Sequence, residues 1–234
     1  MLELHILRVF CGDDGSAGNP LGVFLDGGSV PEADRQAVAA DLGFSETVFV
    51  DDSGTGEIRI FTPAVEIPFA GHPVVGTAWL LARERGGVLA LHPPAGEVPV
   101  RTEGEWTYAA GRPEWAPEFE FVELDSPAEV EALDGSPRSD VETGMWAWID
   151  EAGGVLRERV FAEPFGIPED EATGAAAVAL TARLGRPLDI RQGRGSRIVT
   201  RPLDDGMVEL AGRVALEEVR GYSLAGPEAD PRIP

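Results

Sequence analysis

The sequence contains no lysine, since all nineteen of its basic residues are arginine. Without a lysine amine the chain cannot form a Schiff base with a carbonyl compound. This excludes the usual pyridoxal phosphate enzymes and the class I aldolases. The phosphate-binding P-loop motif also requires a lysine. The absence of lysine therefore excludes three common classes of protein.

Positive charge is scarce as well: nineteen basic residues stand against forty-one acidic ones, for a formal net charge of −22. A surface this acidic repels phosphate backbones and anionic lipids, so we expect neither nucleic acid nor a membrane as a partner. No apolar run approaches the roughly 18 residues of a membrane span. Residues 1–5 lack the basic start of a secretory signal.

Cysteine and histidine are too few for a metal cluster. Cys11 is the single cysteine, so no disulfide forms within the chain. The three histidines, His5, His72 and His92, show no paired ligand spacing, so we expect no metal. A reduced, cytoplasmic setting is the natural interpretation.

The 234 residues correspond to one large domain or two small ones, at about 150 residues per domain. With 43% hydrophobic and 26% charged residues, the composition is that of a globular protein. A proline at its start and a glycine after its end predict a surface helix over 31–42. Apolar alternation between turn signals predicts strands over 2–10, 22–25, 45–50, 57–62, 97–101, 106–110, 119–124, 145–150, 155–161, 196–201, 207–211 and 213–220.

Two further helices are predicted over 74–85 and 172–184. Both are apolar on nearly every side and end in arginine followed by glycine. A helix that is apolar all round must be buried all round. Similar strands precede the two helices, Arg59–Thr62 before the first and Arg159–Ala162 before the second. This repeat at a spacing of about 100 residues indicates an internal duplication.

The duplication sets the expected architecture. Gly71–Ala78 aligns with Glu169–Ala176, which makes Asp170 the counterpart of His72. We expect an α+β fold of two pseudo-symmetric halves, each with strands wrapped around one apolar helix, and an active-site cleft between them. The predicted boundaries are 1–104 for the first half, 105–222 for the second half and 223–234 for a tail. A return of the last strand to the first half is an alternative.

The glycines near the starts of both buried helices have two interpretations. Helix N-termini carry unpaired N–H groups and the positive end of the helix dipole, so two of them facing one cleft would hold a carboxylate. Alternatively, the glycines only permit tight turns into the helices. The residues alone leave both interpretations open.

Three titratable residues are candidates for chemistry. Glu46 alternates with Phe44 and Val48 on one face of a predicted strand. Burial there would raise its pKa and suit it to proton transfer, whereas on an edge strand it would simply face water. His72 and Asp170 would orient a substrate or relay protons across the cleft, or else only stabilise helix starts.

Several short motifs occur together in this chain. They are Gly18-Asn19-Pro20, Phe44-Ser45-Glu46-Thr47, Phe49, Phe61-Thr62-Pro63, Glu66, Pro68-Phe69-Ala70-Gly71-His72-Pro73, Gly76-Thr77-Ala78, Asp170 and Thr173-Gly174. Their combination resembles the PhzF family of phenazine-biosynthesis isomerases, well over residues 1–85 and recognisably over 165–180. The resemblance implies the diaminopimelate epimerase-like fold, whose two similar halves agree with the duplication.

The resemblance also implies a function. It implies a cofactor-free isomerase that moves a proton in a small cyclic unsaturated carboxylic acid, such as a dihydro-hydroxyanthranilate, in secondary-metabolite biosynthesis. Glu46 would be the base and acid, while His72 and Asp170 would orient the substrate's polar groups. The residues implied to bind the substrate are Asn19, Gly71, Gly174 and Ala175, the last three through backbone N–H groups. A homodimer is expected from the resemblance alone.

Two departures from the family pattern bear on activity. Ala175 stands where the family has a serine, and the segment Gln192–Ser196 is compressed. A carboxylate-binding protein without activity is therefore an alternative, and a dehydratase or cyclase is another. A racemase with two facing cysteine thiols is disfavoured because Cys11 is the only cysteine.

Overall fold

The computed structural model describes residues 2–138, 140–163 and 166–223, so all of the predicted tail but its first residue lies outside the described residues. The helices in these ranges are α1 (Glu32–Leu42), α2 (Gly71–Arg85), α3 (Pro127–Glu131) and α4 (Gly174–Leu184), with 3₁₀ turns η1 (Gly27–Ser29) and η2 (Pro113–Trp115). The strands are β1 (Leu2–Cys11), β2 (Asn19–Phe24), β3 (Glu46–Asp52), β4 (Glu57–Phe61), β5 (Glu66–Ile67), β6 (Ala90–Leu91), β7 (Val98–Glu103), β8 (Trp106–Gly111), β9 (Phe119–Glu123), β10 (Glu142–Asp150), β11 (Val155–Ala162), β12 (Ile167–Asp170), β13 (Leu188–Gln192), β14 (Ser196–Pro202) and β15 (Val208–Tyr222). None of the helices described is long and apolar enough to cross a membrane.

A continuous sheet runs through the molecule in the order β5-β4-β3-β2-β1-β15-β14-β13-β11-β10-β9. The first part of β15 pairs with β14 and β8, and its remainder, from Arg213 onward, pairs with β1. The sequence predicted two separate strands here, 207–211 and 213–220. That prediction was wrong, because Gly212 continues the strand. A Cβ atom at Gly212 would lie only 2.3 Å from the ring of Phe10, so glycine permits this close crossing.

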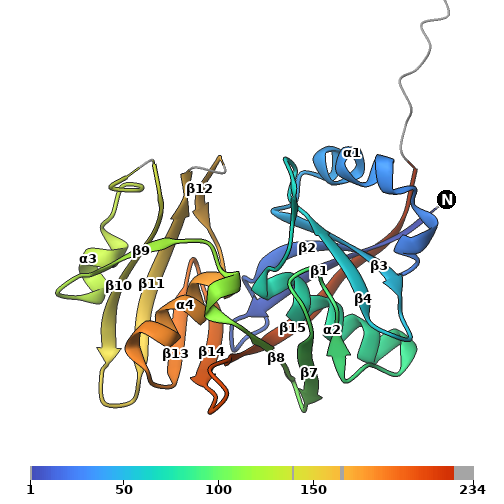
Figure 1. Cartoon of the computed structure of the whole chain (residues 1–234). Coiled ribbons are helices and arrows are strands. Elements are labelled where there is room, and N and C mark those ends of the chain that lie inside the picture. Colours follow the sequence, from blue (N-terminus) through green and yellow to red (C-terminus); the bar gives the residue numbers. More distant parts are fainter. Residues whose placement is uncertain (1, 139, 164–165, 224–234) are drawn as a thin grey trace, which may run out of the picture.

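The helices α2 and α4 lie at the centres of the two halves (Figure 1). α2 packs on β1, β2, β3 and β8, while α4 packs on β14, β15 and β9. Most residues of both helices are buried, as their apolar sequences predict, and each helix ends at a left-handed glycine, Gly86 or Gly185. Their starts differ from the prediction: α2 begins at Gly71 rather than 74, and α4 begins at Gly174 rather than 172.

The two halves repeat each other strand by strand. β2 runs parallel to β3, as β9 runs parallel to β10. The antiparallel succession β3, β4 and β5 has its equivalent in β10, β11 and β12. The register corresponds too, because Thr47 pairs with Phe61 as Thr143 pairs with Phe161. The predicted α+β architecture of two similar halves around two buried helices is therefore present.

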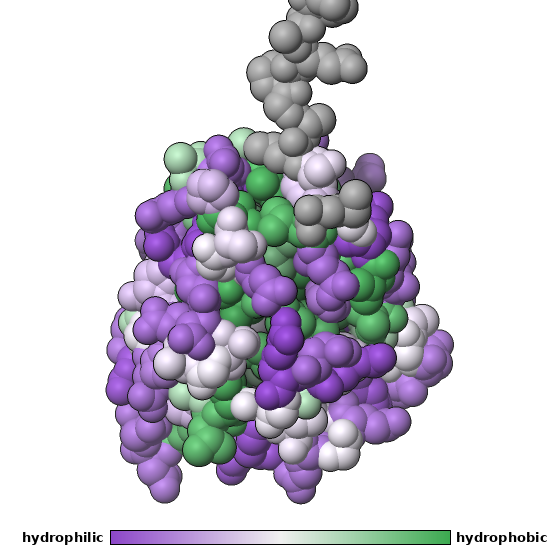
Figure 2. All heavy atoms as spheres, turned by 90° about the vertical axis from the view of Figure 1, so that its right-hand side faces the viewer, coloured by the Kyte–Doolittle hydropathy of each residue, from purple (hydrophilic) through white to green (hydrophobic). Residues whose placement is uncertain are grey.

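The hydrophobic core extends through both halves, and the surface is mostly hydrophilic. Residues of both central helices belong to one apolar cluster, and a smaller cluster lies beneath α1. Figure 2 views the first half from its outer side and shows mostly hydrophilic surface with apolar residues between. That surface agrees with the excess of acidic residues in the sequence.

Candidate active site

Glu46 and His72 form the centre of the candidate site. Glu46 is the first residue of β3, and His72 is the second residue of α2. Glu46 Oε2 lies 3.4 Å from His72 Nε2. Both atoms are buried and have no hydrogen-bond partner among the described residues. Buried polar atoms without partners are rare, and a functional role is one of their main explanations.

Burial shifts the pKa values of this pair in opposite directions. It raises the pKa of Glu46 to about 7, with the Ser45 hydroxyl lowering it only in part. It lowers the pKa of His72 to about 4, against the charge of Asp170 and a hydrogen bond to the Pro20 carbonyl. At neutral pH His72 is therefore uncharged, while Glu46 is divided between acid and carboxylate. A carboxyl group with such a pKa can both take and give a proton.

The environment of Glu46 decides between the two interpretations of that residue. Its side chain is 16% exposed, and Val48 on the same face of β3 belongs to the core. Glu46 is therefore a largely buried glutamate and not a solvated edge residue.

Asp170, at the end of β12, brings the second half into the site. Its Oδ1 accepts a hydrogen bond of 2.7 Å from Asn19 Nδ2, and its Oδ2 accepts one of 2.6 Å from Thr173 Oγ1. Asn19 also donates to the carbonyl of Ala172 at 3.0 Å. Burial and the charge of Glu46 raise the pKa of Asp170. Asn19, in the first half, thus holds a carboxyl group of the second.

The starts of α2 and α4 meet at Gly71 and Gly174. A Cβ atom added to Gly71 would lie 2.5 Å from the Cα of Gly174, and the reverse distance is 2.6 Å. Neither helix has a side-chain hydrogen bond at its N-cap, and their first backbone bonds come from the N–H groups of Val74 and Ala177. The preceding N–H groups point toward the place where the two positive helix ends converge. This arrangement suits a carboxylate.

The contact between the two glycines corrects the predicted alignment of the halves. Because Gly71 and Gly174 both open their helices, His72 corresponds to Ala175. Asp170 then corresponds to Ile67, which occupies the same position in β5 as Asp170 in β12. Asp170 is therefore not the counterpart of His72, although both contribute to one site.

Two residues of this region were not predicted. Gln192 of β13 accepts a hydrogen bond from Thr173 N at 3.0 Å and donates to the carbonyl of Asp170, also at 3.0 Å. Glu142, the first residue of β10, is buried, and its pKa is raised to about 7 by burial and by the charges of Asp170 and Glu46. The dipeptide Glu142-Thr143 repeats Glu46-Thr47, a signal in the sequence that would have identified it.

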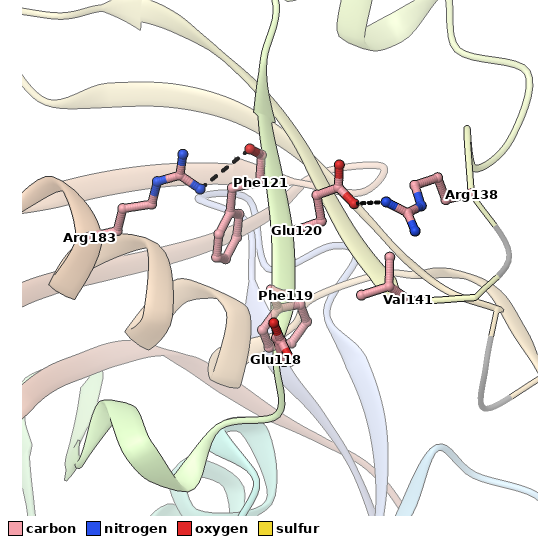
Figure 3. Close-up of a pocket in the computed structure, with 7 residues that line it drawn as sticks. All are labelled: Glu118, Phe119, Glu120, Phe121, Arg138, Val141 and Arg183. Carbon is pink, nitrogen blue, oxygen red and sulfur yellow. Dashed lines mark hydrogen bonds and ion pairs between the residues drawn. The ribbon is translucent and has the colours of Figure 1, made fainter.

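A surface cavity of about 470 Å³ is lined in part by Val141 and Phe119, which are the chain neighbour and the pairing partner of Glu142 (Figure 3). It lies beside β9, where Arg138 pairs with Glu120 and Arg183 donates to the carbonyl of Phe121. Glu46, His72 and Asp170 do not line it. Within residues 2–138, 140–163 and 166–223, no group of three or more His, Cys, Asp or Glu side chains is arranged to hold a metal ion.

The fold defines a class of proteins built from two similar halves, and in this chain titratable side chains of both halves gather between them. A PhzC/PhzF phenazine biosynthesis protein from Clostridium difficile superimposes with a TM-score of 0.78 at 20% identity, covering 96% of this chain and 100% of its own. A hydroxyproline epimerase from Agrobacterium vitis gives a TM-score of 0.62 at 11% identity, covering 97% and 93%. The predicted diaminopimelate epimerase-like fold is confirmed by these matches.

The chain belongs to the PhzC/PhzF family of phenazine biosynthesis-like proteins, whose family model matches residues 8–148. A trans-2,3-dihydro-3-hydroxyanthranilate isomerase from Pseudomonas aeruginosa is 32% identical over 90% of this chain and 92% of its own length. The enzyme of the same name from Pseudomonas fluorescens is 31% identical over 75% of this chain and 80% of its own. The protein is an isomerase, as the sequence predicted.

Proposed function

We propose that this isomerase moves a proton within a small cyclic unsaturated amino or hydroxy carboxylic acid, with Glu46 as its acid–base group. The observation that carries the proposal is the state of Glu46: a buried carboxyl with a pKa of about 7, 3.4 Å from the imidazole of His72. The substrate named for the relatives, trans-2,3-dihydro-3-hydroxyanthranilate, belongs to this chemical class.

The proposed reaction needs one base and one acid. The carboxylate of Glu46 takes a proton from a ring carbon next to a double bond, and the electron pair of the broken C–H bond shifts that double bond by one position. The far carbon then receives a proton, which in the simplest form returns from the carboxyl of Glu46. Proton transfers of this kind contribute about 10²–10⁴-fold to a rate.

The surrounding groups support binding of such a substrate. Unpaired N–H groups of Gly71, Gly174 and Ala175 at the converging helix ends would hold its carboxylate. His72, uncharged at neutral pH, and the half-buried Asp170 would bind its amino or hydroxyl substituents.

The proposal also includes a biological role, an assembly state and a location in the cell. A role in secondary-metabolite biosynthesis, a homodimeric assembly and a cytoplasmic location rest on the family resemblance and on composition.

Proton NMR in D₂O tests the proposal. The protein is incubated with trans-2,3-dihydro-3-hydroxyanthranilic acid and with a panel of cyclic unsaturated amino and hydroxy acids. We expect deuterium at one or two ring carbons and a new isomer with the wild-type protein, and neither with Glu46→Gln. Normal turnover by Glu46→Gln would contradict the role of Glu46. Saturable binding by the wild-type protein without exchange in any compound would instead fit a carboxylate-binding relative that lacks this reaction.

A further inference from the structure

A second buried glutamate lies in this region and has no part in the reaction described above. Glu142 is the first residue of β10, and it is only 8% exposed. Its Oε2 atom is buried and has no hydrogen-bond partner among the described residues. A carboxyl group in this condition costs free energy of folding, so its presence calls for a reason.

Glu142 occupies the position in the second half that Glu46 occupies in the first. Glu142 opens the strand that runs parallel to β9, and Glu46 opens the strand that runs parallel to β2. The threonine after each glutamate pairs with a phenylalanine of the next antiparallel strand, Phe161 or Phe61. The two glutamates therefore correspond by strand, by register and by face.

The register also shows which way Glu142 faces. Directly paired residues of neighbouring strands share a face, and so do residues two apart along one strand. Gly144 pairs with Val160, and Val160 pairs with Asp170. Glu142 lies two residues before Gly144, so it shares a face with Asp170. Val160 and Trp146 on that face belong to the core around α4.

The charges of the site act on Glu142. Burial raises its pKa to about 7, and the carboxylates of Asp170 and Glu46 add to the rise. Glu46 has a pKa of about 7 for the same main reason. A carboxyl group with a pKa near neutrality is divided between acid and carboxylate at pH 7, so one of the two can act as an acid and the other as a base.

We propose that Glu142 is a second catalytic residue, which exchanges a proton with the far carbon of the substrate's double-bond system while Glu46 acts at the near carbon. The proposal rests on the proposed function and divides its acid–base work between the two halves. A substrate held by its carboxylate at the starts of α2 and α4 would then meet one glutamate from each half.

The proposed step balances without a further reactant. The Glu46 carboxylate forms an O–H bond as the near C–H bond breaks, and the electron pair shifts the double bond. The far carbon forms its new C–H bond with the proton of the Glu142 carboxyl, which becomes a carboxylate. One proton has entered Glu46 and one has left Glu142, so exchange with water restores both groups. The reverse reaction exchanges the two roles.

Glu158 provides a matched control. It is a buried glutamate on β11, its two oxygens have no partner among the described residues, and burial raises its pKa to about 8. It pairs with Trp146, four residues farther along β10 than Glu142, and its Oε1 atom lies beside Gly144, 3.1 Å from where a Cβ atom of that residue would be. Its pKa is affected by Arg157 and not by Glu46 or Asp170.

The experiment follows two signals in D₂O with trans-2,3-dihydro-3-hydroxyanthranilic acid: deuterium entering the near carbon of recovered substrate, and formation of the isomer. With Glu142→Gln we expect the near carbon to exchange within about threefold of the wild-type rate, while isomer formation falls about 100-fold or more. Glu46→Gln should lose both signals. Glu158→Gln should keep both within about threefold.

The outcomes distinguish proton transfer by Glu46 alone from proton transfer by Glu46 and Glu142 together. Isomer formation at the wild-type rate by Glu142→Gln would overturn the proposal, and so would an equal loss of both signals. Absence of any conversion by the wild-type protein would instead overturn the proposed function, which separates the two failures.

A measurement on the wild-type protein covers the case in which Glu142→Gln does not fold. Substrate deuterated at the near carbon is converted in ordinary water. Transfer by two carboxyl groups leaves no deuterium at the far carbon, and deuterium carried there would show that a single group moved it.

Discussion

Asn19 donates a 2.7 Å hydrogen bond to Asp170, and this contact joins the two halves of the molecule beside the candidate catalytic carboxyl. Asn19→Ala removes the donor and leaves Asp170 Oδ1 without this partner in a partly buried place. We expect a loss of about 1–3 kcal/mol in the free energy of unfolding and a higher KM. Chemical denaturation and steady-state kinetics measure the two effects.

Ser45→Ala is the comparison for stability alone, since Ser45 Oγ donates a longer bond of 3.3 Å to Asn19 Oδ1 and leaves the bond from Asn19 to Asp170 in place. It should cost less than Asn19→Ala. Equal stability of Asn19→Ala and the wild-type protein would show that the amide does not hold the halves together.

The pH dependence of activity follows from the state of Glu46. The base must be ionised, and burial raises its pKa to about 7. We expect kcat/KM to fall about tenfold per pH unit below 7, whereas an ordinary glutamate would keep the enzyme active down to about pH 4–5. His72, with its pKa lowered to about 4, adds no transition near neutrality. An acidic limb with a midpoint near 4.5 would contradict a buried base.

The pH dependence of stability provides an independent test of the same group. The pKa of Glu46 is higher in the folded protein, about 7, than its ordinary value of 4.5. The folded state therefore binds the proton more tightly, and this stabilisation is complete below pH 4.5 and lost as the pH rises through 7. Glu46→Gln removes that dependence. It should become more stable relative to the wild-type protein between pH 4.5 and 7, by up to about 3 kcal/mol.

Urea denaturation of both proteins at pH 4.5, 6 and 8 gives the difference directly. A constant difference across this range would mean that Glu46 titrates in the folded protein as it does in water.

Gly71 is held to glycine by its contact with Gly174. A Cβ atom at Gly71 would lie 2.5 Å from the Cα of Gly174, and backbone cannot yield as a flexible side chain does. We expect Gly71→Ala to cost about 1–3 kcal/mol and to weaken carboxylate binding, because the two helix starts must separate. Gly195→Ala is the control, since its Cβ would meet only Ala17 at 3.5 Å. Thermal denaturation that shows equal midpoints for the two variants would contradict close packing of the helix starts.

The main features of the fold were predictable where burial dominates the sequence. An apolar helix has one stable environment, the core, so α2 and α4 were recognised and their last residues were correct. The strand β12 was missed because Ile167-Pro168-Glu169-Asp170 has neither alternation nor β-branched residues after its first position. Its backbone is held by pairing with β11, which is a tertiary contact.

The sequence identified candidate residues that the structure brings together, but it aligned the two halves wrongly. Glu46, His72 and Asp170 do gather, yet a local likeness around Gly76 and Gly174 shifted the alignment of the halves by five residues, since Gly71 is the true counterpart. Register comes from strand pairing across the sheet, and this pairing cannot be read from one segment of sequence. The same shift hid the equivalence of Glu142 and Glu46, which is recognised only when β10 is aligned with β3.

Ala175 offers a gain-of-function test at the start of α4. It is the second residue of that helix and is buried, at the converging helix ends where we place the substrate carboxylate. A serine hydroxyl there adds a donor beside the unpaired N–H groups. We expect Ala175→Ser to bind anthranilate about 3–10-fold more tightly, which corresponds to a hydrogen bond of about 0.5–1.5 kcal/mol. Ala179→Ser, one turn along the same face, should leave the Kd unchanged. Isothermal titration calorimetry measures both variants. Equal affinities for the two would place the carboxylate away from α4 and leave α2 alone to bind it.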